Sequence, residues 1–505
     1  MRKFIYNDTA LVIISGLLTA LSTNKAVFIL AWVCYIPLFI IIAKQQSKKA
    51  VKSGLVFGLS IALSSFYWMI PGAGRFTGSS VIYGILVYIV SSIILSTFFG
   101  LIALCFAVLK RNFTGKTGNI LLNAILAACI FTIAEALFMA FSKHFPWFDF
   151  HTGNAIANNL YAIQPAEYFG VHILTFVVVL VNYLAASFIL QKQWLKLAIP
   201  AGIITVYLIA GIAINNKYID TQEHSVSVAI LSQNTPPETK WNDNTGDALA
   251  GKMIDMARTA ATMKPDIALW SESAVPWTYR KDDDLVNEIL KVTASAKVTH
   301  ILGINTEYSK KEVYNSAYCL LPDRTVTGRY DKQVLLSLIE TPVAGFIFPF
   351  MSGGGFYERP GLYDKPLNTP YGKAGIIICN EATVPSASYN QVKNGAKFIL
   401  NLSNDGWFSN SYLVDLHFYN VRLRAVETRK DIVVNSNTGY SGLVKASGEI
   451  IMKKKSPASF VDVVNVVPNN YKTLVVTHPL LFVYLCIVGL LYFIIARISI
   501  LIRKN

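Results

Sequence analysis

A cysteine at the end of an apolar run is the first residue in the sequence with the placement to do chemistry. Residues 375–378 (GIII) are wholly apolar, which is typical of a buried strand, and Cys379 follows directly with Asn380 and Glu381 behind it. A thiol held at a strand end is in position to act as a nucleophile. A free cysteine considered alone more often fills core space, so the nucleophile interpretation depends on residues elsewhere in the chain.

Two other strand-like segments also end in reactive side chains. Residues 266–270 (DIALW) lead into Glu272, and a hairpin-like stretch ends at Lys332. A thiol near its ordinary pKa is mostly protonated at neutral pH, so a nucleophilic cysteine needs a base or a positive neighbour. Glu272 can take the proton, while Lys332 and the backbone N–H of Asn380 can stabilise the oxyanion. Together these groups predict acyl transfer through a thioester on Cys379.

The order and spacing of the three residues resemble those of the nitrilase superfamily. Lys332 follows Glu272 by about 60 residues and Cys379 follows Lys332 by about 50, and the segment WSESAVP (residues 270–276) resembles the superfamily's W-x-E-x-A-x-P. The resemblance implies an α-β-β-α sandwich with a glutamate base, a lysine and a cysteine nucleophile. It also favours the nucleophile interpretation of Cys379 over the core-filling one.

The composition excludes an ordinary soluble enzyme. Of 505 residues, 53% are hydrophobic and only 15% are charged, against roughly 25% charged residues in average chains. About eight transmembrane helices are predicted, at residues 9–22, 26–43, 54–70, 81–109, 119–141, 170–190, 197–214 and 479–496. The first of them has a signal peptide as an alternative, because it is short and preceded by basic residues.

The loop charges predict how the chain is oriented in a membrane. Basic residues cluster at 2–3, 44–52, 110–116, 192–196 and 497–504, all on one side if eight spans alternate, whereas the opposite short loops carry only Lys25, Arg75 and Lys143. The positive-inside rule places both termini in the cytoplasm and the long segment on the outer face. We therefore expect a membrane domain at 1–216, a periplasmic catalytic domain at 217–478, and an eighth span with a cytoplasmic tail at 479–505. The net charge of +15 reflects this bias and not nucleic-acid binding.

The long outer segment alternates strands and helices, as expected of a layered α/β domain. Predicted strands lie at 225–231, 266–270, 300–305, 313–321, 325–330, 397–402, 432–436, 441–445 and 460–466, and predicted helices at 246–263, 282–296, 383–394 and 412–429. The chain has six cysteines, but a Cys319–Cys379 disulfide is not expected, since Cys319 lies within a strand and pairing would consume the nucleophile. No motif predicts a metal or cofactor site.

Several residues of the membrane part leave two interpretations open. Phe145 and Trp147 belong to an aromatic outer loop that either forms an interfacial belt or contacts substrate, and Tyr67 and Trp68 have the same ambiguity. Glu135 is an acidic residue well inside a predicted span, so it is either functional or a buried structural hydrogen-bonding group.

The whole arrangement resembles the apolipoprotein N-acyltransferase family, and the resemblance covers nearly the entire chain. It includes Glu340, Glu381, Trp241 and the run NLSNDGWFSNS at 401–411, which contains Trp407. It implies that Glu340 assists near Lys332, that Glu381 orients the site, and that Trp241 and Trp407 line an acyl entrance, although each can instead be structural. The segment 344–357 is predicted to be a mobile lid or a core strand with a loop. Asn380 departs from the family, in which an aromatic residue follows the cysteine.

The resemblance implies an enzyme that moves an acyl chain from a membrane phospholipid to the N-terminal amine of a diacylglyceryl lipoprotein in the bacterial inner membrane. We expect a monomer. One alternative is a membrane-anchored amidase that hydrolyses a small amide. The many predicted spans disfavour it, because a single transmembrane anchor would be enough to tether a hydrolase. The other is a transporter or scaffold without activity, which the presence of Glu272, Lys332 and Cys379 disfavours.

Overall fold

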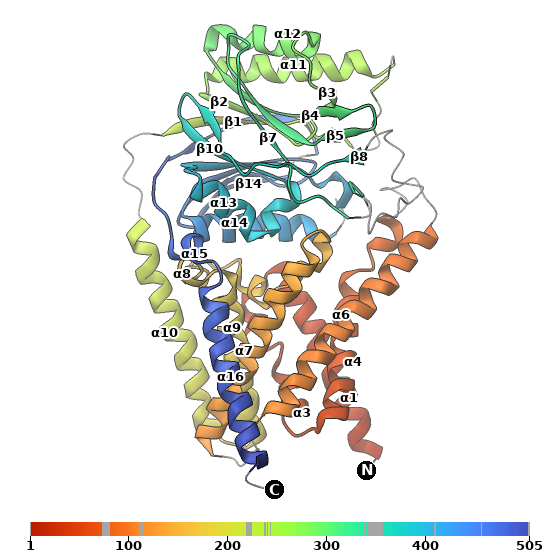
Figure 1. The fold of residues 1–505 in the computed structure, drawn as a ribbon, viewed down its shortest axis with the longest axis vertical. Coiled ribbons are helices and arrows are strands. Elements are labelled where there is room, and N and C mark those ends of the chain that lie inside the picture. Colours follow the sequence, from red (N-terminus) through yellow and green to blue (C-terminus); the bar gives the residue numbers. More distant parts are fainter. Residues whose placement is uncertain are drawn as a thin grey trace.

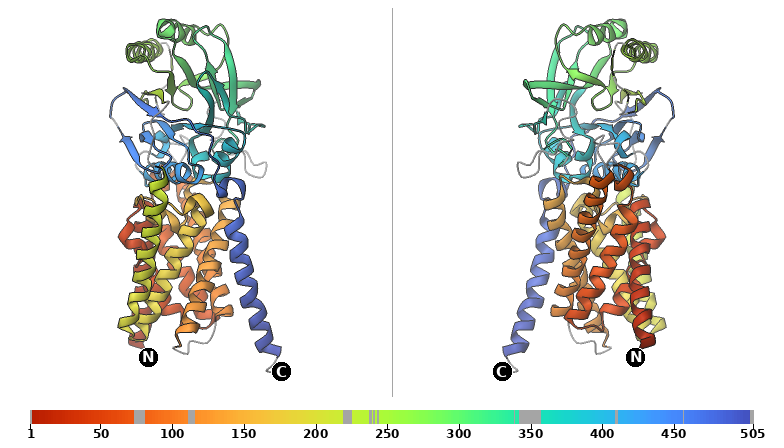
Figure 2. Two further views of the ribbon diagram at one scale, coloured as in Figure 1. Left: turned by 90° about the vertical axis from the view of Figure 1, so that its left-hand side faces the viewer. Right: turned by 90° about the vertical axis from the view of Figure 1, so that its right-hand side faces the viewer.

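The chain folds into two stacked bodies, a bundle of long helices and an α/β body built on two sheets (Figures 1 and 2). The computed structural model describes residues 2–72, 81–110, 116–218, 225–236, 239, 241–242, 244–337, 339–341, 357–408, 411–455 and 457–502. The first helix begins and the last helix ends at the far end of the helical body, away from the sheets.

The helical body contains most of the predicted spans. Its helices are α1 (Arg2–Lys25), α2 (Phe28–Ala31), α3 (Ile36–Ile42), α4 (Ser47–Ser65), α6 (Val81–Leu109), α7 (Thr117–Ser142), α8 (Ala166–Phe169), α9 (Val171–Leu190), α10 (Ala198–Asn215), α15 (Leu474–Thr477) and α16 (Leu481–Ile502). Among the described residues, five helices are long and apolar enough to cross a membrane: Val81–Leu109, Thr117–Ser142, Val171–Leu190, Trp194–Tyr218 and Leu481–Ser499. The predicted number of eight is therefore not confirmed.

The second and third predicted spans differ from the prediction for local reasons. The stretch 26–43 is not one helix but two short ones, α2 and α3, and Pro37 lies in the first turn of α3. Proline lacks the N–H that would continue a preceding helix, so it favours a helix start. The helix α4 carries Lys48, Lys49 and Lys52 near its beginning, which shortens its apolar part.

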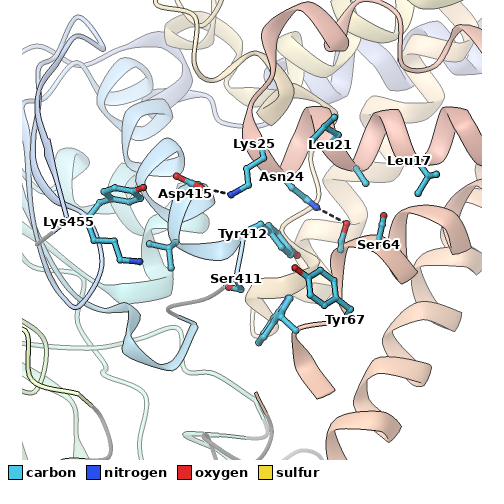
Figure 3. A pocket seen from close by; sticks show the side chains of 15 residues that line it. Leu17, Leu21, Asn24, Lys25, Ser64, Tyr67, Ser411, Tyr412, Asp415 and Lys455 are labelled. Atoms are coloured by element: carbon cyan, nitrogen blue, oxygen red, sulfur yellow. Dashed lines mark hydrogen bonds and ion pairs between the residues drawn. The ribbon is translucent and has the colours of Figure 1, made fainter. Parts of the chain in front are cut away.

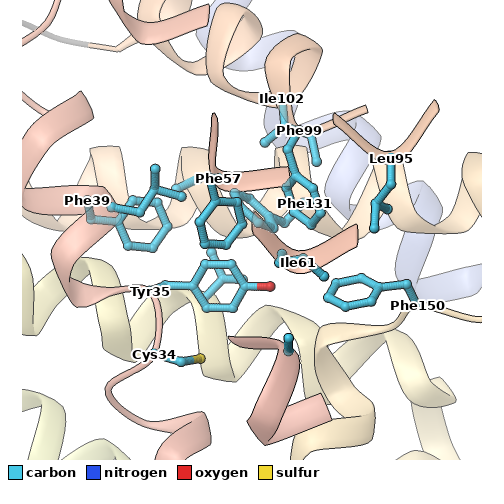
Figure 4. Close-up of a cluster of buried hydrophobic side chains, with 14 of the residues drawn as sticks. Cys34, Tyr35, Phe39, Phe57, Ile61, Leu95, Phe99, Ile102, Phe131 and Phe150 are labelled. Atoms are coloured by element: carbon cyan, nitrogen blue, oxygen red, sulfur yellow. The ribbon is translucent and has the colours of Figure 1, made fainter. Parts of the chain in front are cut away.

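Aromatic rings fill the centre of the helical body (Figure 4). The ring of Tyr35 packs against those of Phe57 and Phe131, with centroids 5.5 Å and 5.4 Å away. Nearby, the buried carboxylate of Glu135 accepts hydrogen bonds from the hydroxyls of Thr152 (2.5 Å) and Thr175 (2.6 Å). These contacts favour the structural interpretation of Glu135, because its oxygens are used to join α7 to the loop before α9 and to α9 itself.

The α/β body is a sandwich of two sheets covered by helices. One nine-stranded sheet runs β15-β1-β2-β4-β5-β8, with β3 and β6 paired to β4 and β7 paired to β6, and the six-stranded sheet runs β14-β13-β12-β11-β10-β9. The strands are β1 (Val226–Ser232), β2 (Ile267–Trp270), β3 (Val275–Thr278), β4 (Thr299–Ser309), β5 (Glu312–Tyr314), β6 (Ser316–Leu320), β7 (Val326–Asp331), β8 (Tyr357–Glu358), β9 (Leu367–Thr369), β10 (Gly372–Ile378), β11 (Phe398–Asn404), β12 (Ile432–Asn437), β13 (Ser441–Val444), β14 (Ile450–Lys454) and β15 (Phe460–Val466).

Helices cover both outer faces of the sandwich, as Figure 1 shows. The helices α11 (Gly246–Met263) and α12 (Asp284–Thr293) lie on the nine-stranded sheet, and α13 (Pro385–Lys393) and α14 (Leu413–Thr428) lie between the six-stranded sheet and the helical body. Buried side chains such as Ile230, Ile376 and Leu400 form the core between the sheets. The layer order is α-β-β-α, so the expected fold class of this body is confirmed.

Most predicted strands and helices of this body are present, and one error is informative. The predicted strand 313–321 is two strands, β5 and β6, interrupted at Asn315. The interruption matters because the side chain of Asn315 bonds to Glu272. Strands β3, β8, β9 and β14 were not predicted, since they are only two to five residues long and carry little periodicity.

Candidate active site

The three predicted catalytic residues come from the ends of strands in both sheets. Glu272 follows β2 and Lys332 follows β7 in the nine-stranded sheet, whereas Cys379 follows β10 in the six-stranded sheet. The turn that carries Glu272 lies tightly against β4: a Cβ added at Gly303 would clash with the carbonyl oxygen of Ser271. Packing of the two sheets therefore brings together residues that are far apart in the sequence.

Lys332 is fully buried between two carboxylates. Its Nζ atom lies 3.1 Å from Oε1 of Glu272 and 2.7 Å from Oε1 of Glu340. Burial alone would lower the pKa of the ammonium, but the two carboxylates raise it well above its ordinary value. Lys332 therefore carries a fixed positive charge inside the sandwich.

Cys379 is held in a conformation that few residues other than glycine adopt. Its φ is +51°, and it begins the 3₁₀ turn η7 (Cys379–Thr383) that leads from β10 towards α13. Burial raises the pKa of the thiol well above its ordinary value and Glu272 adds to the rise, while Lys332 opposes it. The thiol is thus protonated at rest, and a base must remove its proton when the nucleophile reacts.

Glu381 fixes the turn on which Cys379 lies. Its carboxylate accepts hydrogen bonds from the backbone N–H groups of Ile378 (2.7 Å) and Gln333 (2.7 Å) and from the hydroxyl of Tyr330 (2.9 Å). Burial raises the pKa of Glu381 to about 7, and the backbone donors act in the opposite direction. One buried side chain therefore ties the strand before Cys379 to the segment that follows Lys332.

Asn380 contributes a second tie between the same two segments. It is fully buried, and its Nδ2 donates to the carbonyl oxygen of Val334 at 3.0 Å. The amide thus takes a position in which the family resemblance implies an aromatic ring, and it holds the η7 turn by a hydrogen bond.

Three polar residues that the sequence analysis did not select also belong to this centre. Asn315 donates from Nδ2 to Oε1 of Glu272 at 2.9 Å, and Asp405 contributes to the electrostatics of Cys379. Glu358 has a buried carboxyl oxygen without a hydrogen-bond partner among the described residues. Burial raises the pKa of Glu358 well above its ordinary value, and Glu340 adds to the rise. Asp405 lies in the family-like run 401–411, whereas Asn315 and Glu358 carry no local sequence signal.

The predicted substrate-binding residues are placed in different parts of the molecule. Trp241 packs edge-on against Trp277, with centroids 5.2 Å apart, beside the α11–α12 layer. Trp147 is buried and its Nε1 donates to Ser91, while Phe145 packs edge-on against it at 5.5 Å. Trp407 belongs to the 3₁₀ turn η8 (Asp405–Phe408), but its side chain lies outside the described residues, as does the predicted lid segment apart from Tyr357.

The helix α14 and Arg429 directly after it fix the α/β body to the helical body. Arg422 donates from Nη1 to the carbonyl oxygens of Ala157 (3.1 Å) and Asn158 (2.7 Å), and Arg429 donates from Nε to Glu167 at 2.6 Å. Both guanidinium groups are buried, so breaking these contacts would leave an unpaired charge inside the protein. The predicted catalytic residues are consequently held in a fixed relation to the apolar helices.

Two family models match the chain. The apolipoprotein N-acyltransferase N-terminal domain matches residues 15–184 and the carbon-nitrogen hydrolase domain matches residues 227–455. An apolipoprotein N-acyltransferase of Geobacter metallireducens is 27% identical over 461 residues, covering 88% of this chain and 86% of the relative. Relatives with the same name from Haemophilus ducreyi (26% over 404 residues, 76% of each chain) and Borreliella burgdorferi (27% over 473 residues, 87% and 86%) also match.

Proposed function

Because the chain belongs to the apolipoprotein N-acyltransferase family, we propose that it transfers a fatty acyl chain from a membrane phospholipid to the N-terminal α-amine of an S-diacylglyceryl-cysteine lipoprotein. The observation that carries the proposal is the convergence of Glu272, Lys332 and Cys379 in a body fixed to apolar helices. Such helices give a thiol centre access to two lipid substrates.

The first half-reaction forms a thioester. Glu272 takes the proton from the thiol of Cys379, and the sulfur attacks the ester carbonyl of the phospholipid. The ammonium of Lys332 and the backbone N–H of Asn380 stabilise the oxyanion. Stabilising the charge that develops in the transition state is usually the largest contribution of preorganised groups to catalysis. The ester C–O bond then breaks, and the lysophospholipid leaves with the proton from Glu272.

In the second half-reaction, Glu272 again acts first as a base and then as an acid. The acceptor amine, having released one proton to become neutral, attacks the thioester carbonyl while Glu272 accepts a further proton. An amide bond forms, the C–S bond breaks, and Glu272 returns its proton to the sulfur of Cys379. This is a ping-pong mechanism in which Glu340 and Glu381 act by holding Lys332 and the nucleophile turn.

The cellular arrangement is part of the same proposal. The membrane domain comprises residues 1–216 with seven spans, the catalytic domain comprises residues 217–478 and faces the periplasm, and residues 479–505 return to the cytoplasm. The loop charges support this orientation in the inner membrane of a bacterium. We further propose that the protein acts as a monomer.

Intact mass spectrometry of the purified protein after incubation with phospholipid alone tests this function. An adduct with the mass of a fatty acyl group should map to Cys379 and disappear when a diacylglyceryl peptide is added. If Cys379 acquires no adduct from any phospholipid but the protein hydrolyses a small soluble amide, the chain is instead an amidase.

A further inference from the structure

The loop between β8 and β9 carries the two most exposed large apolar side chains of the α/β body among the described residues. Leu362 is 76% exposed and Tyr363 is 69% exposed. Pro360 and Pro366 flank this loop (residues 361–365), and proline restricts the backbone conformation at both ends. Two such side chains next to each other on one loop indicate a surface that contacts an apolar partner.

The beginning of the 361–365 loop is fixed to the backbone of Lys332. The N–H of Gly361 donates to the carbonyl oxygen of Lys332 at 2.8 Å. A Cβ added at Gly361 would clash with the carbonyl oxygen of Asp331, so only glycine lets the loop pass this close to the end of β7. The exposed pair therefore begins one residue after a direct hydrogen bond to the proposed catalytic lysine.

The other end of the 361–365 loop is held on α13. Oδ2 of Asp364 accepts a hydrogen bond from Nδ2 of Asn390 at 2.8 Å, and the carbonyl oxygen of Asp364 accepts one from Nδ2 of Asn394 at 2.7 Å. The helix α13 lies between the six-stranded sheet and the helical body (Figure 1). The loop consequently belongs to the layer of the α/β body that faces the helical body, and not to the far layer formed by α11 and α12.

The helix α13 also contacts the segment that leads into α16. Val475 of α15 packs in one core cluster with Tyr389 and Val392 of α13. The helix α16 follows α15, and its residues Leu481–Ser499 are long and apolar enough to cross a membrane. Since Asn390, which holds the loop, is the neighbour of Tyr389, the 361–365 loop lies beside the place at which the chain enters the last predicted span.

The charges around the 361–365 loop favour a phospholipid surface. Lys365, Lys393 and Lys472 are all exposed, and Nζ of Lys472 donates to the carbonyl oxygen of Lys393 at 3.1 Å. The acidic residue of the loop, Asp364, is used in the bond to α13. Nζ of Lys365 lies 5.5 Å from the centre of the Tyr363 ring. Tyrosine with lysine at a surface is typical of segments that lie among lipid headgroups.

The size of the exposed pair favours lipid over a protein partner. An aromatic side chain buries about 150–250 Å² in a contact, so Leu362 and Tyr363 together supply at most about 400 Å². A stable protein interface buries about 800 Å² on each partner. Insertion of a few apolar side chains at the boundary between headgroups and acyl chains requires no such area.

We propose that the 361–365 loop docks in the headgroup layer of the membrane, with Leu362 and Tyr363 at the upper acyl chains and Lys365 at the lipid phosphates. The inference rests on the proposed arrangement in the membrane, for which it names the part of the α/β body that contacts lipid. Because Gly361 bonds to Lys332, the docked loop also holds the proposed catalytic lysine near the depth at which the ester of a phospholipid lies.

Quenching by brominated phospholipid tests the docking directly. Tyr363→Trp, Met263→Trp and Tyr484→Trp are each placed in nanodiscs with and without bromine on the acyl chains, and the emission of the wild-type protein is subtracted. The emission added by Tyr363→Trp should be quenched. That added by Met263→Trp should not, because Met263 ends α11 on the far layer of the α/β body and is 45% exposed.

Tyr484→Trp separates failure of the inference from failure of the membrane arrangement. Tyr484 lies on α16 and is 58% exposed, so its variant should be quenched if α16 spans the membrane. Quenching of Tyr484→Trp without quenching of Tyr363→Trp would overturn the docking loop alone. No quenching of either variant would contradict the membrane arrangement and the docking together.

Kinetics separate docking from a role in the fold of the site. The double variant Leu362→Ser, Tyr363→Ser should lower kcat/KM for thioester formation from phospholipid in nanodiscs about tenfold, as expected when about one large apolar side chain is no longer buried in lipid. With a short-chain p-nitrophenyl ester in solution the change should stay within about twofold, since both side chains are exposed. Met263→Ser is the control and should leave both rates unchanged.

The outcomes for the inference and for the function are distinct. Equal losses with phospholipid and with the soluble ester would show that the loop shapes the site itself, and would overturn the docking role. Wild-type protein that forms no thioester from phospholipid contradicts the proposed function instead. The quenching of Tyr363→Trp still decides the docking in that case, because it requires no catalysis.

Discussion

The Nζ atom of Lys332 lies 2.7 Å from Oε1 of Glu340, and the other oxygen of Glu340 accepts from the backbone N–H of Leu336 at 2.8 Å. Glu340 therefore orients the lysine and also closes the loop that follows it. Since Lys332 also contacts Glu272, the position of the ammonium depends on both carboxylates.

Glu340→Gln should consequently reduce acylation without removing the nucleophile. The neutral amide holds Lys332 less firmly, so the ammonium moves towards Glu272 and away from the oxyanion. We expect kcat/KM for thioester formation to fall about 100-fold, comparable to removing one oxyanion donor. Glu312→Gln is the control, because Glu312 is partly exposed and pairs with Arg359. An equal loss in both variants would contradict a specific role for Glu340.

Serine substitutions at the two cysteines of the sandwich should have different effects on acyl transfer. Cys379→Ser should fold and insert in membranes but form no acyl-enzyme, because a hydroxyl is a far weaker nucleophile in a site shaped for a thiolate. Cys319→Ser should remain active, since its sulfur is buried on β6, where it packs in the core between the sheets and lies near the carbonyl oxygen of Asn368. Intact mass spectrometry with phospholipid distinguishes them. Loss of the adduct in Cys319→Ser alone would reassign the nucleophile.

Glu381→Gln should lower both stability and activity. The amide NH₂ would face N–H donors that now donate to a carboxylate, and one unsatisfied buried group costs about 1–3 kcal/mol. We expect a lower Tm in detergent and slower thioester formation. Tyr330→Phe removes only one donor and should have a smaller effect. A Tyr330→Phe variant as damaged as Glu381→Gln would show that the hydroxyl, and not the backbone ties, fixes the turn.

Glu358 should make stability depend on pH in a defined direction. The folded protein holds the pKa of Glu358 well above that of the unfolded chain, so between these values the folded state binds more protons. Stability from this group is full below the unfolded pKa and falls as pH rises, by up to about 1.4 kcal/mol per pH unit. The side chain of Glu358→Gln resembles the protonated carboxyl but cannot titrate, so the variant does not lose stability from this position as pH rises. Its Tm relative to wild type should therefore increase from pH 5 to pH 8, and a constant difference would contradict a buried, protonated Glu358.

The sequence alone was sufficient for the parts of the site that depend on local pattern. Apolar runs ending at Trp270 and Ile378 predicted the strands before Glu272 and Cys379, and a hairpin-like pattern predicted the strand before Lys332. The same patterning placed α11 and β15 at their observed bounds and the apolar helices of 81–109, 119–141, 170–190 and 479–496 close to theirs.

Tertiary structure decided which of these strand ends meet and what surrounds them. Asn315 and Glu358 join the centre only because β5 and β8 lie at the edge of the nine-stranded sheet, and such pairing between distant segments leaves no local periodicity. The ion pair of Lys25 with Asp415 likewise joins α1 to α14 across a sequence separation of 390 residues (Figure 3). Local sequence specifies which residues can form a strand or helix, whereas contacts between distant segments are set by packing of the whole fold.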